Sequence, residues 1–327
     1  MEVLLLREAD IRELVGPSEA LRESRAAFAK LGRGEVVLPE VMFLDLPEHR
    51  GEVHAKGAYL RGTPYFSIKV ASGFSGNPER GLPVGAGAVW VFDATTGLLA
   101  AMLLDNGYLT ELRTGAAGAL SIDLLARSSV RQVGIVGCGV QARYQLQALM
   151  GVRRPERVLV FCRTEGSAAA FAAEMEFSLG VSVRAAGSAR EAVEEADIVV
   201  TTTTSRGPVV FDGWIRPGTH IAAIGSDVPE KQELDPALLG RAKVVADRLA
   251  QCVTQGEIHH AIEARSITVD QVYAELGEIA AGLKPGRETD KEITICDMTG
   301  VGALDAAMAN VVVTAAMQHH VGERIRA

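Results

Sequence analysis

The chain has 327 residues, a formal net charge of −8 and 48% hydrophobic residues. That length can hold two domains with cores of their own, and an acidic chain without a Lys/Arg run is not expected to bind nucleic acid. The N-terminal segment lacks the basic region and cleavage site of a signal peptide, and no stretch of about 18 apolar residues could span a membrane. We therefore expect a cytoplasmic protein without membrane contacts.

The four cysteines are scattered and form no C-x-x-C motif; they are Cys138, Cys162, Cys252 and Cys296. This pattern predicts reduced thiols. The histidines form no H-E-x-x-H motif, and the pairs His259-His260 and His319-His320 are adjacent residues that point apart on a helix. We therefore predict no metal site.

The first third of the chain predicts a mostly β domain. A strand over 3–6 is followed by a helix that ends at Gly32. Short apolar runs then alternate with turns rich in Pro and Gly, which is typical of an antiparallel sheet. The predicted strands cover residues 41–46, 52–60, 66–71, 87–93 and 98–104. A helix over 110–126 follows, and Ser128-Ser129 marks the predicted domain boundary.

From residue 131 strands and helices alternate. Strands are expected at 133–137, 158–161, 181–184, 198–202, 220–224, 243–246 and 292–296, and helices at 166–178, 188–195, 256–263 and 269–281. This alternation predicts an α/β fold with a doubly wound parallel sheet over residues 129–301. The long apolar helix over 302–320 is expected to return to the first domain or to a subunit interface. Residues 1–128 and 302–327 thus form an α+β domain with an antiparallel sheet.

A dinucleotide fingerprint, G-x-G-x-x-A, follows the first strand of the second domain. Gly137 allows a tight turn, Gly139 lets a pyrophosphate approach the backbone, and Ala142 lets the helix pack against the strand. The backbone amides of the first helical turn, which includes Val140 and Gln141, are free to bind phosphate. We therefore predict a bound dinucleotide.

The residues after the next strand bear on the choice of cofactor. NAD sites place an acid there for the ribose hydroxyls, whereas NADP sites supply arginine and a hydroxyl. Here Arg163 and Thr164 precede the first acid, Glu165, so NAD(P)H is expected with a slight preference for NADP(H). Arg163 could instead stack on adenine and accept either cofactor. Thr202 and Thr203 are expected to line the cofactor cleft, unless they reflect only the β-propensity of threonine.

Three charged residues lie at positions where packing of a hydrophobic core does not explain a charge. Lys69 lies within an apolar strand, either as a functional cation or as an edge lysine with a solvated head. Arg113 opens an alanine-rich helix, where a cation gains nothing from the helix dipole, so it could bind an anion or pair with Glu111 or Asp123. Asp227 follows a strand at the edge where open α/β sheets bind ligands, or it serves as a helix cap.

With these motifs the chain resembles the ornithine cyclodeaminase/mu-crystallin family over nearly its whole length. The resemblance is carried by Lys69 together with R-G-L-P at 80–83, L-x-x-L-R-T at 109–114, the glycine fingerprint, G-S-D-x-P-x-K-x-E-L at 225–234 and T-G-V-G-A at 299–303. The family includes ornithine cyclodeaminases, L-alanine dehydrogenases and imine reductases. The resemblance implies a homodimer whose sheet domain supplies both the substrate site and the subunit contact.

The resemblance also implies roles for particular residues. Lys69 and Arg113 are expected to bind the α-carboxylate of the substrate, and Asp227 is expected to act as the acid/base. Thr114 and Val301 lie in two of the shared tracts and are expected near the cofactor. The tract around Val301 would close over the nicotinamide ring, or it would only cap the helix that follows.

One departure from the family bears on the substrate. Ornithine cyclodeaminases carry an arginine in a P-P-R tract, but residues 38–43 here contain none, so ornithine cyclisation is in doubt. His54 and Lys56 lie two residues apart on one strand, so they share a face, either toward a substrate or as a solvated edge pair.

The resulting hypothesis is NAD(P)H-dependent reduction of an α-imino acid to an L-amino acid, with an acidic substrate such as iminosuccinate. The alternatives are a cyclodeaminase that uses NAD catalytically and a non-catalytic NADP-binding protein similar to mu-crystallin.

Overall fold

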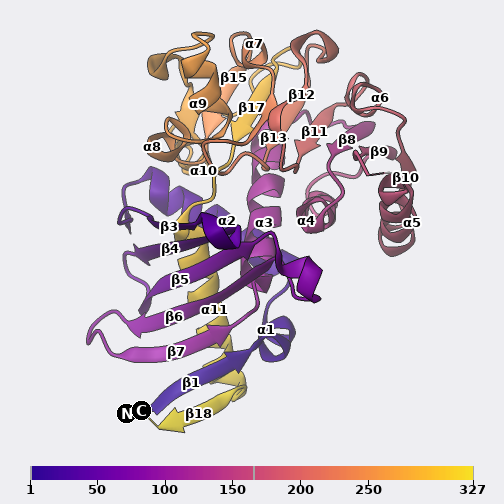
Figure 1. Cartoon of the computed structure of the whole chain (residues 1–327). Helices are drawn as coiled ribbons and strands as arrows, with labels where there is room; N and C mark the ends of the chain where they lie inside the picture. The colour runs from indigo at the N-terminus through magenta and orange to yellow at the C-terminus, as the bar shows by residue number, and fades with distance from the viewer. Residues whose placement is uncertain (1, 165, 327) are drawn as a thin grey trace. The chain divides into compact units, whose positions relative to one another are not determined.

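The computed structural model describes residues 2–164 and 166–326. The chain divides into two compact units (Figure 1), one of Met1–Arg113 with Val301–Ala327 and one of Thr114–Gly300. The division falls within helix α3 (Tyr108–Leu125), whereas the sequence pattern placed the boundary after it, at Ser128-Ser129. The extent of the two domains stays a prediction, but each unit has a sheet of its own.

The first unit is a mixed sheet covered by helices. The strand order is β18-β1-β7-β6-β5-β4-β2, with β3 paired to β4, and neighbours are antiparallel except for the parallel pair β1 and β7. The strands are β1 (Glu2–Arg7), β2 (Val36–Val37), β3 (Met42–Leu46), β4 (Gly51–Leu60), β5 (Tyr65–Phe74), β6 (Gly85–Asp93), β7 (Leu99–Leu104) and β18 (Glu323–Arg326). The helices are α1 (Glu8–Leu14), α2 (Pro17–Gly32), α11 (Gly302–His319) and the short 3-10 turns η1 (Pro47–His49) and η2 (Asn77–Arg80).

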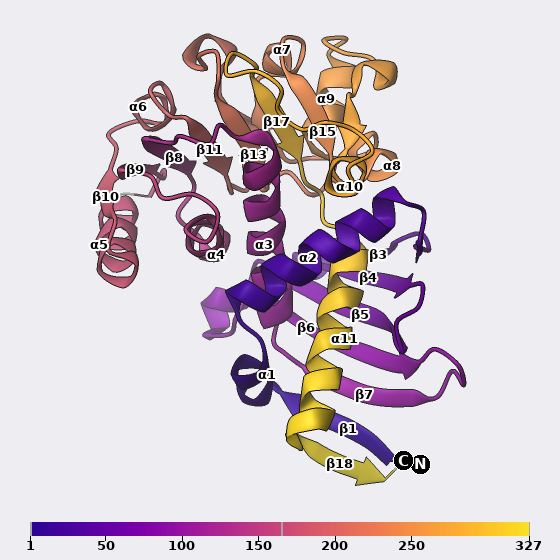
Figure 2. The same cartoon turned by 180° about the vertical axis from the view of Figure 1, so that it is seen from behind.

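The C-terminal helix returns to this unit, as predicted, but it ends earlier than expected. Helix α11 packs on β4, β5 and α2 on one face of the sheet (Figure 2). It stops at His319 because His320 adopts the left-handed conformation and Gly322 has a φ of 97°. The chain then reverses, and β18 pairs antiparallel with β1. The helix predicted over 302–320 therefore ends at His319, one residue early, and Glu323–Arg326 form a strand instead of continuing the helix to the chain end.

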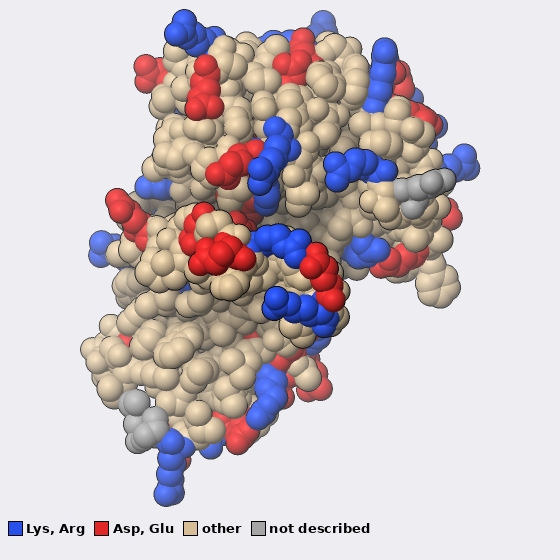
Figure 3. Space-filling model, in the orientation of Figure 1, with Lys and Arg blue, Asp and Glu red and all other residues tan. Residues whose placement is uncertain are grey.

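The other face of this sheet is apolar and open. Side chains alternate between the two faces of a strand, so Val89 and Val91 are buried while Trp90 between them is exposed. We call the exposed side the outer sheet face; it carries Met42, Leu44, Ile68, Val70 and Trp90. Figure 3 shows few charged side chains over this sheet.

The second unit is built on a parallel sheet with the order β10-β9-β8-β11-β13-β17-β15-β16. Its strands are β8 (Gln132–Val136), β9 (Arg157–Phe161), β10 (Ser182–Ala185), β11 (Ile198–Thr201), β13 (His220–Ala223), β15 (Lys243–Ala246), β16 (Ala274–Glu275) and β17 (Thr294–Asp297), and β12 (Arg206–Val210) pairs with β14 (Gln232–Leu234) beside them. The first five positions follow the 3-2-1-4-5 order of a dinucleotide-binding fold, which confirms the predicted fold class. The order reverses between β8 and β11, which is where such sheets bind ligands.

Helices connect these strands, and the central strands are buried along their whole length. The helices are α4 (Val140–Leu149), α5 (Ser167–Leu179), α6 (Ala189–Val193), α7 (Pro236–Leu239), α8 (Leu249–Cys252), α9 (Gly256–Glu263) and α10 (Leu276–Ala280), with 3-10 turns η3 (Asp212–Trp214) and η4 (Val269–Gln271). Every residue of β8, β11, β13 and β17 is buried, as expected for a parallel sheet covered on both faces. No helix in the described ranges is long and apolar enough to cross a membrane.

The predicted helix over 269–281 was wrong. That segment forms the 3-10 turn η4, the short strand β16 and then α10. Strand β16 extends the parallel sheet because Ala274 and Glu275 pair with Val245 and Ala246 of β15. The amide of Glu275 then donates to the Glu278 side chain at 2.9 Å, which starts a new helix. Pairing with a neighbouring strand has overridden the helical periodicity of the segment.

Candidate functional site

The turn between β8 and α4 has the shape that a dinucleotide needs. Gly137 has a φ of 109°, and a Cβ atom there would lie 2.5 Å from Oγ1 of Thr202, so only glycine fits. A Cβ atom on Gly139 would meet no described atom within 4 Å, so the backbone is open on that side. Val140 begins helix α4 and is exposed, whereas Ala142 is completely buried.

The first turn of α4 is also free to bind an anion. In the described part of the chain no side chain caps this helix at its N-cap residue, Gly139. Uncapped amides and the helix dipole favour a phosphate group at this position. The residues present therefore fit the pyrophosphate of a dinucleotide.

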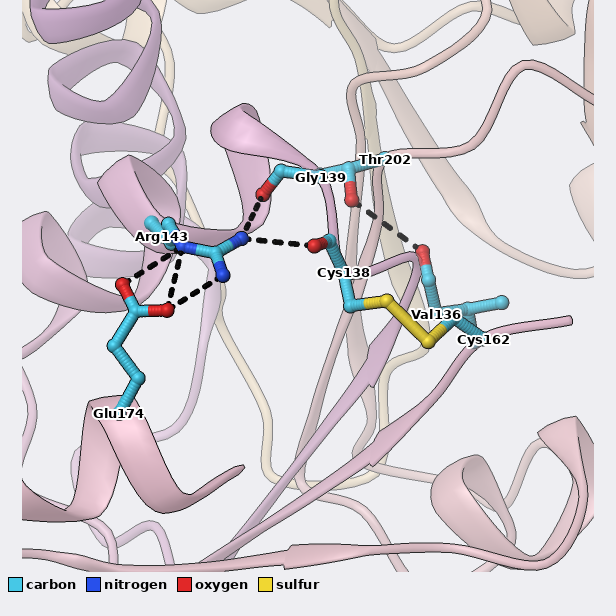
Figure 4. The surroundings of a disulfide bond; sticks show 7 residues. All are labelled: Val136, Cys138, Gly139, Arg143, Cys162, Glu174 and Thr202. Carbon is cyan, nitrogen blue, oxygen red and sulfur yellow. Dashed lines mark hydrogen bonds and ion pairs between the residues drawn. A yellow bond between two sulfur atoms is a disulfide. The ribbon is translucent and has the colours of Figure 1, made fainter. Parts of the chain in front are cut away.

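Arg143 of helix α4 binds this turn through hydrogen bonds, a role that was not predicted from the sequence. Its guanidinium donates to the carbonyls of Cys138 at 2.9 Å and Gly139 at 3.1 Å, and its other nitrogens bind Glu174 of α5 at 2.6 to 3.1 Å (Figure 4). Because these bonds fix two carbonyls of the turn, they hold its backbone conformation. A basic residue in the first turn of the fingerprint helix was the available signal.

A disulfide bond joins Cys138 in this turn to Cys162 at the end of β9, with their Cα atoms 5.9 Å apart. The prediction of reduced thiols was therefore wrong for this pair. The two residues are 24 positions apart, but β8 and β9 are parallel neighbours whose ends meet at one edge. Cys252 and Cys296 are free and buried.

The loops after β11 and β13 are fixed to each other by a buried carboxylate, Glu233. It accepts hydrogen bonds from the amides of Thr203 at 2.5 Å and Gly225 at 2.9 Å. A Cβ atom on Gly225 would lie 2.6 Å from the amide nitrogen of Thr203, so the loops touch closely. Burial raises the pKa of Glu233. In the sequence Glu233 is one position of the G-S-D-x-P-x-K-x-E-L tract, and its burial could not be predicted from that tract.

Asp227 lies in the loop after β13 with half of its side chain exposed. Its carboxylate forms an ion pair with Nζ of Lys231 at 2.7 Å, and it caps no helix. The carboxylate is therefore accessible from solvent, as the acid/base hypothesis requires.

In the first unit, Lys69 and Arg113 meet at one buried carboxylate, Asp305. Nζ of Lys69 lies 2.9 Å and Nε of Arg113 lies 3.0 Å from the same oxygen, Oδ1. Lys69 also donates to Thr110 at 3.1 Å. Lys69 is therefore not a solvated edge lysine, and Arg113 pairs with Asp305. Asp305 was not among the predicted site residues, although it is the one acid near the start of the apolar helix.

Burial and the neighbouring charges shift the pKa values of this cluster in opposite directions. Burial lowers the pKa of Lys69 to about 8, although the charge of Asp305 opposes the shift. Burial alone would raise the pKa of Asp305, but Arg113 and Lys69 outweigh it and hold that pKa below its usual value. Oδ2 of Asp305 has no hydrogen-bond partner in residues 2–164 and 166–326. Lys56 adds a third positive charge that acts on both Lys69 and Asp305.

His54 and Lys56 share the face of Lys69. The register places Lys56 directly opposite Lys69 on the neighbouring strand, and opposite residues project to one side of a sheet. His54 lies two residues earlier, half-buried, with its ring 4.8 Å from that of Phe43. The structure therefore places both predicted residues on the side of the sheet that α11 covers.

The remaining predicted cofactor residues differ in exposure. Arg163 and Thr164 follow β9 and are exposed, while Glu165 lies outside the described residues. Thr114 lies in α3, and its carbonyl accepts a hydrogen bond from Gln145 of α4 at 2.9 Å. Val301 is buried and precedes α11.

The geometric argument against a metal site was wrong for one histidine pair. The ring centroids of His259 and His260 lie 5.1 Å apart, and ligand atoms of both rings and of Glu263 lie within 4.8 Å of one another. Both rings lean toward Glu263 in the last turn of α9, where they can pair with it when protonated. The absence of a metal stays a prediction.

Comparison with known proteins gives a consistent result. A family model described as "Ornithine cyclodeaminase/mu-crystallin family" matches residues 1–320. The chain is similar to an archaeal alanine dehydrogenase dimer with bound NAD, at 38% identity and a TM-score of 0.94, covering 100% of this chain and 99% of that one. It is also similar to iminosuccinate reductase of Paracoccus denitrificans in complex with NAD+, at 34% identity and a TM-score of 0.93 over 100% of both chains. A third similar structure is Thermococcus litoralis Δ1-pyrroline-2-carboxylate reductase with NADH and L-proline, at 34% identity and a TM-score of 0.93, covering 99% and 100% of the two chains.

The Asp305 cluster generates a prediction about stability. Asp305→Asn should lower the free energy of unfolding by about 3 kcal/mol or more, because it leaves two buried cations without their anion. Asp227→Asn is the matched control, since it breaks an exposed ion pair and should cost less than about 1 kcal/mol. Urea unfolding of both variants measures the difference. Equal losses would show that the buried carboxylate does not stabilise the fold.

Proposed function

Since the chain belongs to the ornithine cyclodeaminase/mu-crystallin family, we propose that it reduces an α-imino acid to the L-amino acid. It is an NAD(P)-dependent oxidoreductase that acts on imino or amino acids. The observation that carries the proposal is the buried cluster of Lys69, Arg113 and Asp305, with Lys56 on the adjacent strand. Three cations around one carboxylate leave an excess of positive charge, which favours an anionic substrate.

Lys69 and Arg113 would bind the α-carboxylate. Asp305 already shows that Nζ and Nε of these residues converge on one carboxylate oxygen, and it holds both side chains in place. The planar guanidinium of Arg113 keeps further donors for a second carboxylate. Because the pKa of Lys69 is about 8, its charge, and with it part of this attraction, is lost at higher pH. Fixing the carboxylate in this way can contribute about 7–11 kcal/mol to lowering the barrier.

Cofactor binding and proton transfer are assigned to the second unit. The turn at Gly137 and Gly139 and the amides of α4 would hold the pyrophosphate of the cofactor. The nicotinamide cofactor supplies or accepts the hydride when it is bound. Asp227 would deliver a proton to the substrate nitrogen, or remove it in the reverse direction.

A test of Asp227 separates catalysis from binding. Asp227→Asn should reduce kcat about 100-fold, the effect of losing a general acid/base, while the Kd for NADH stays nearly unchanged. Glu230→Gln removes a neighbouring exposed carboxylate and should leave kcat unchanged. A kcat within threefold of the parent would remove Asp227 from the mechanism.

The same assays separate the alternative functions. A reductase changes the absorbance at 340 nm in proportion to the substrate consumed, whereas a cyclodeaminase regenerates its NAD and shows no net change. A non-catalytic binding protein would bind the dinucleotide without turnover of any imino acid.

The second carboxylate of an acidic substrate, such as iminosuccinate, would be bound by Lys56 and His54. Their position on the face of Lys69 supports this proposal, and a diamino acid would meet a like charge at Lys56. With ammonia present, oxaloacetate should be a better substrate than pyruvate. Lys56→Ala should lower kcat/KM for oxaloacetate about 10-fold or more, the cost of one charge-assisted hydrogen bond, and change that for pyruvate by less than threefold.

The opposite substrate preference would assign a different role to Lys56. If pyruvate is preferred and Lys56→Ala weakens both substrates alike, Lys56 binds the carboxylate that they share and the substrate is not a dicarboxylate.

The proposed preference for NADP(H) depends on Arg163, which is exposed just after β9. Arg163→Ala should weaken NADPH about 10- to 100-fold more than NADH, because only NADPH offers a 2′-phosphate for a charge-assisted hydrogen bond. Arg154→Ala, an exposed arginine before β9 begins, should affect neither cofactor. Titration of each variant with both cofactors measures the four Kd values. Equal weakening of the two would favour stacking of Arg163 on adenine.

We also propose that the chain forms a homodimer through the outer sheet face. An exposed apolar sheet surface of this kind typically marks an interaction site, and the similar archaeal alanine dehydrogenase is described as a dimer. Trp90→Glu should convert the dimer to a monomer in sedimentation experiments, because it buries a charge in the interface. Phe177→Glu is the control, since Phe177 is 94% exposed on α5 of the other unit. A parent chain that sediments as a monomer, or a Trp90→Glu variant that stays dimeric, would contradict this assignment.

A further inference from the structure

The disulfide bond joins the two segments of the second unit that would face the cofactor. Cys138 lies between Gly137 and Gly139 in the phosphate-binding turn, and Cys162 is the first residue after β9. The two strand ends are already in register, because the amide of Gly137 donates to the carbonyl of Phe161 at 2.8 Å. The bond therefore connects the turn to the strand end directly beside it, as Figure 4 shows.

Cys162 stands at a position with a known task in dinucleotide-binding folds. The residue at the end of the second strand contacts the hydroxyls of the adenosine ribose. A thiol there can donate and accept a weak hydrogen bond, whereas a disulfide sulfur has no hydrogen to donate. The bond also fixes the backbone at the end of β9, immediately before Arg163. Oxidation thus changes the adenosine end of the site.

The phosphate end of the site does not depend on this bond. Gly139 stays open, and Arg143 holds the carbonyls of Cys138 and Gly139 through a separate link to Glu174. Opening the disulfide would therefore leave the turn in place.

The pair is accessible to reagents, unlike the other two cysteines. Cys138 and Cys162 are both partly exposed, whereas Cys252 and Cys296 are completely buried. Burial also raises the pKa of Cys252 and Cys296 well above the usual value, which makes their thiolates scarce. A disulfide that small thiols can reach is of the labile kind.

We propose that Cys138 and Cys162 are a reversible oxidation site that controls cofactor affinity, with the dithiol binding the dinucleotide more tightly than the disulfide. This inference rests on the proposed function of the glycine turn. The oxidant is a small-molecule disulfide. The thiolate of one cysteine attacks a sulfur of the oxidant and releases one small thiol, which leaves a mixed disulfide. The second cysteine then displaces the other small thiol. The two cysteines are oxidised to the disulfide, and the oxidant is reduced to two small thiols that carry the two protons. Two equivalents of small thiol reverse the reaction.

The experiment compares the two states of the unmodified chain. The protein is equilibrated with reduced or oxidised glutathione, and alkylation followed by mass measurement confirms its state. Calorimetry then gives the Kd for NADH and for ADP-ribose, which carries the adenosine end without the nicotinamide. We expect both ligands to bind the dithiol at least threefold more tightly, by the same factor.

Variants assign the effect to this pair. The double variant Cys138→Ser/Cys162→Ser keeps no thiol at this site that could form a mixed disulfide with glutathione, so it should bind NADH with a Kd that oxidised glutathione does not change. Cys252→Ala is the matched control and should keep the full response, because that cysteine is buried away from the oxidant.

Several results would overturn the inference: the same Kd in both states, tighter binding by the disulfide, no dithiol obtained with excess thiol, or a change for NADH without one for ADP-ribose. The two proposals fail in different ways. If both states bind NADH equally, only the redox inference is wrong, whereas an absence of NADH binding in either state removes the dinucleotide site itself.

Discussion

The first unit depends on the shared carboxylate of Asp305. Two cations and an anion that are buried together lose their hydration, which costs several kcal/mol per ion, and only close mutual contact offsets this loss. Asp305 provides that contact to Lys69 on β5 and Arg113 on α3. The C-terminal helix must therefore return to the sheet for the cations to be tolerated there. The same contact holds the two cations ready for a second carboxylate, which is the basis of the substrate proposal.

The second unit depends on a different constraint, which is the shape of the loops at one edge of its parallel sheet. Glycines make the turn at Gly137 and the close loop contact at Gly225 possible, since a side chain at either position would collide with a neighbour. Glu233 and Arg143 then fix the loops by binding their amides and carbonyls. At this edge the N-terminus of α4, which in the described residues has no side-chain cap, presents the backbone amides that a phosphate needs.

The similar proteins show why the fold does not define the substrate. An alanine dehydrogenase, an iminosuccinate reductase and a pyrroline-2-carboxylate reductase all superimpose on this chain with TM-scores of 0.93 or 0.94. Their names share an amino or imino acid and differ in its side chain. A common fold therefore accommodates amino or imino acids that differ in their side chains, and in our proposal Lys56 is one of the residues that select among them.

The sequence by itself determined most of the strand and helix pattern, the glycine fingerprint and the unusual placement of Lys69 and Arg113. These features are local: periodicity, turn residues and a charge within an apolar run are visible over a few neighbouring positions. Tertiary structure alone decided that Arg113 pairs with Asp305, 192 residues away, and that Cys138 meets Cys162. It also turned part of the segment 269–281 into a strand, because β15 offered unpaired backbone groups beside it. Packing between distant segments determines such partners, and the local sequence pattern does not indicate which segments will meet.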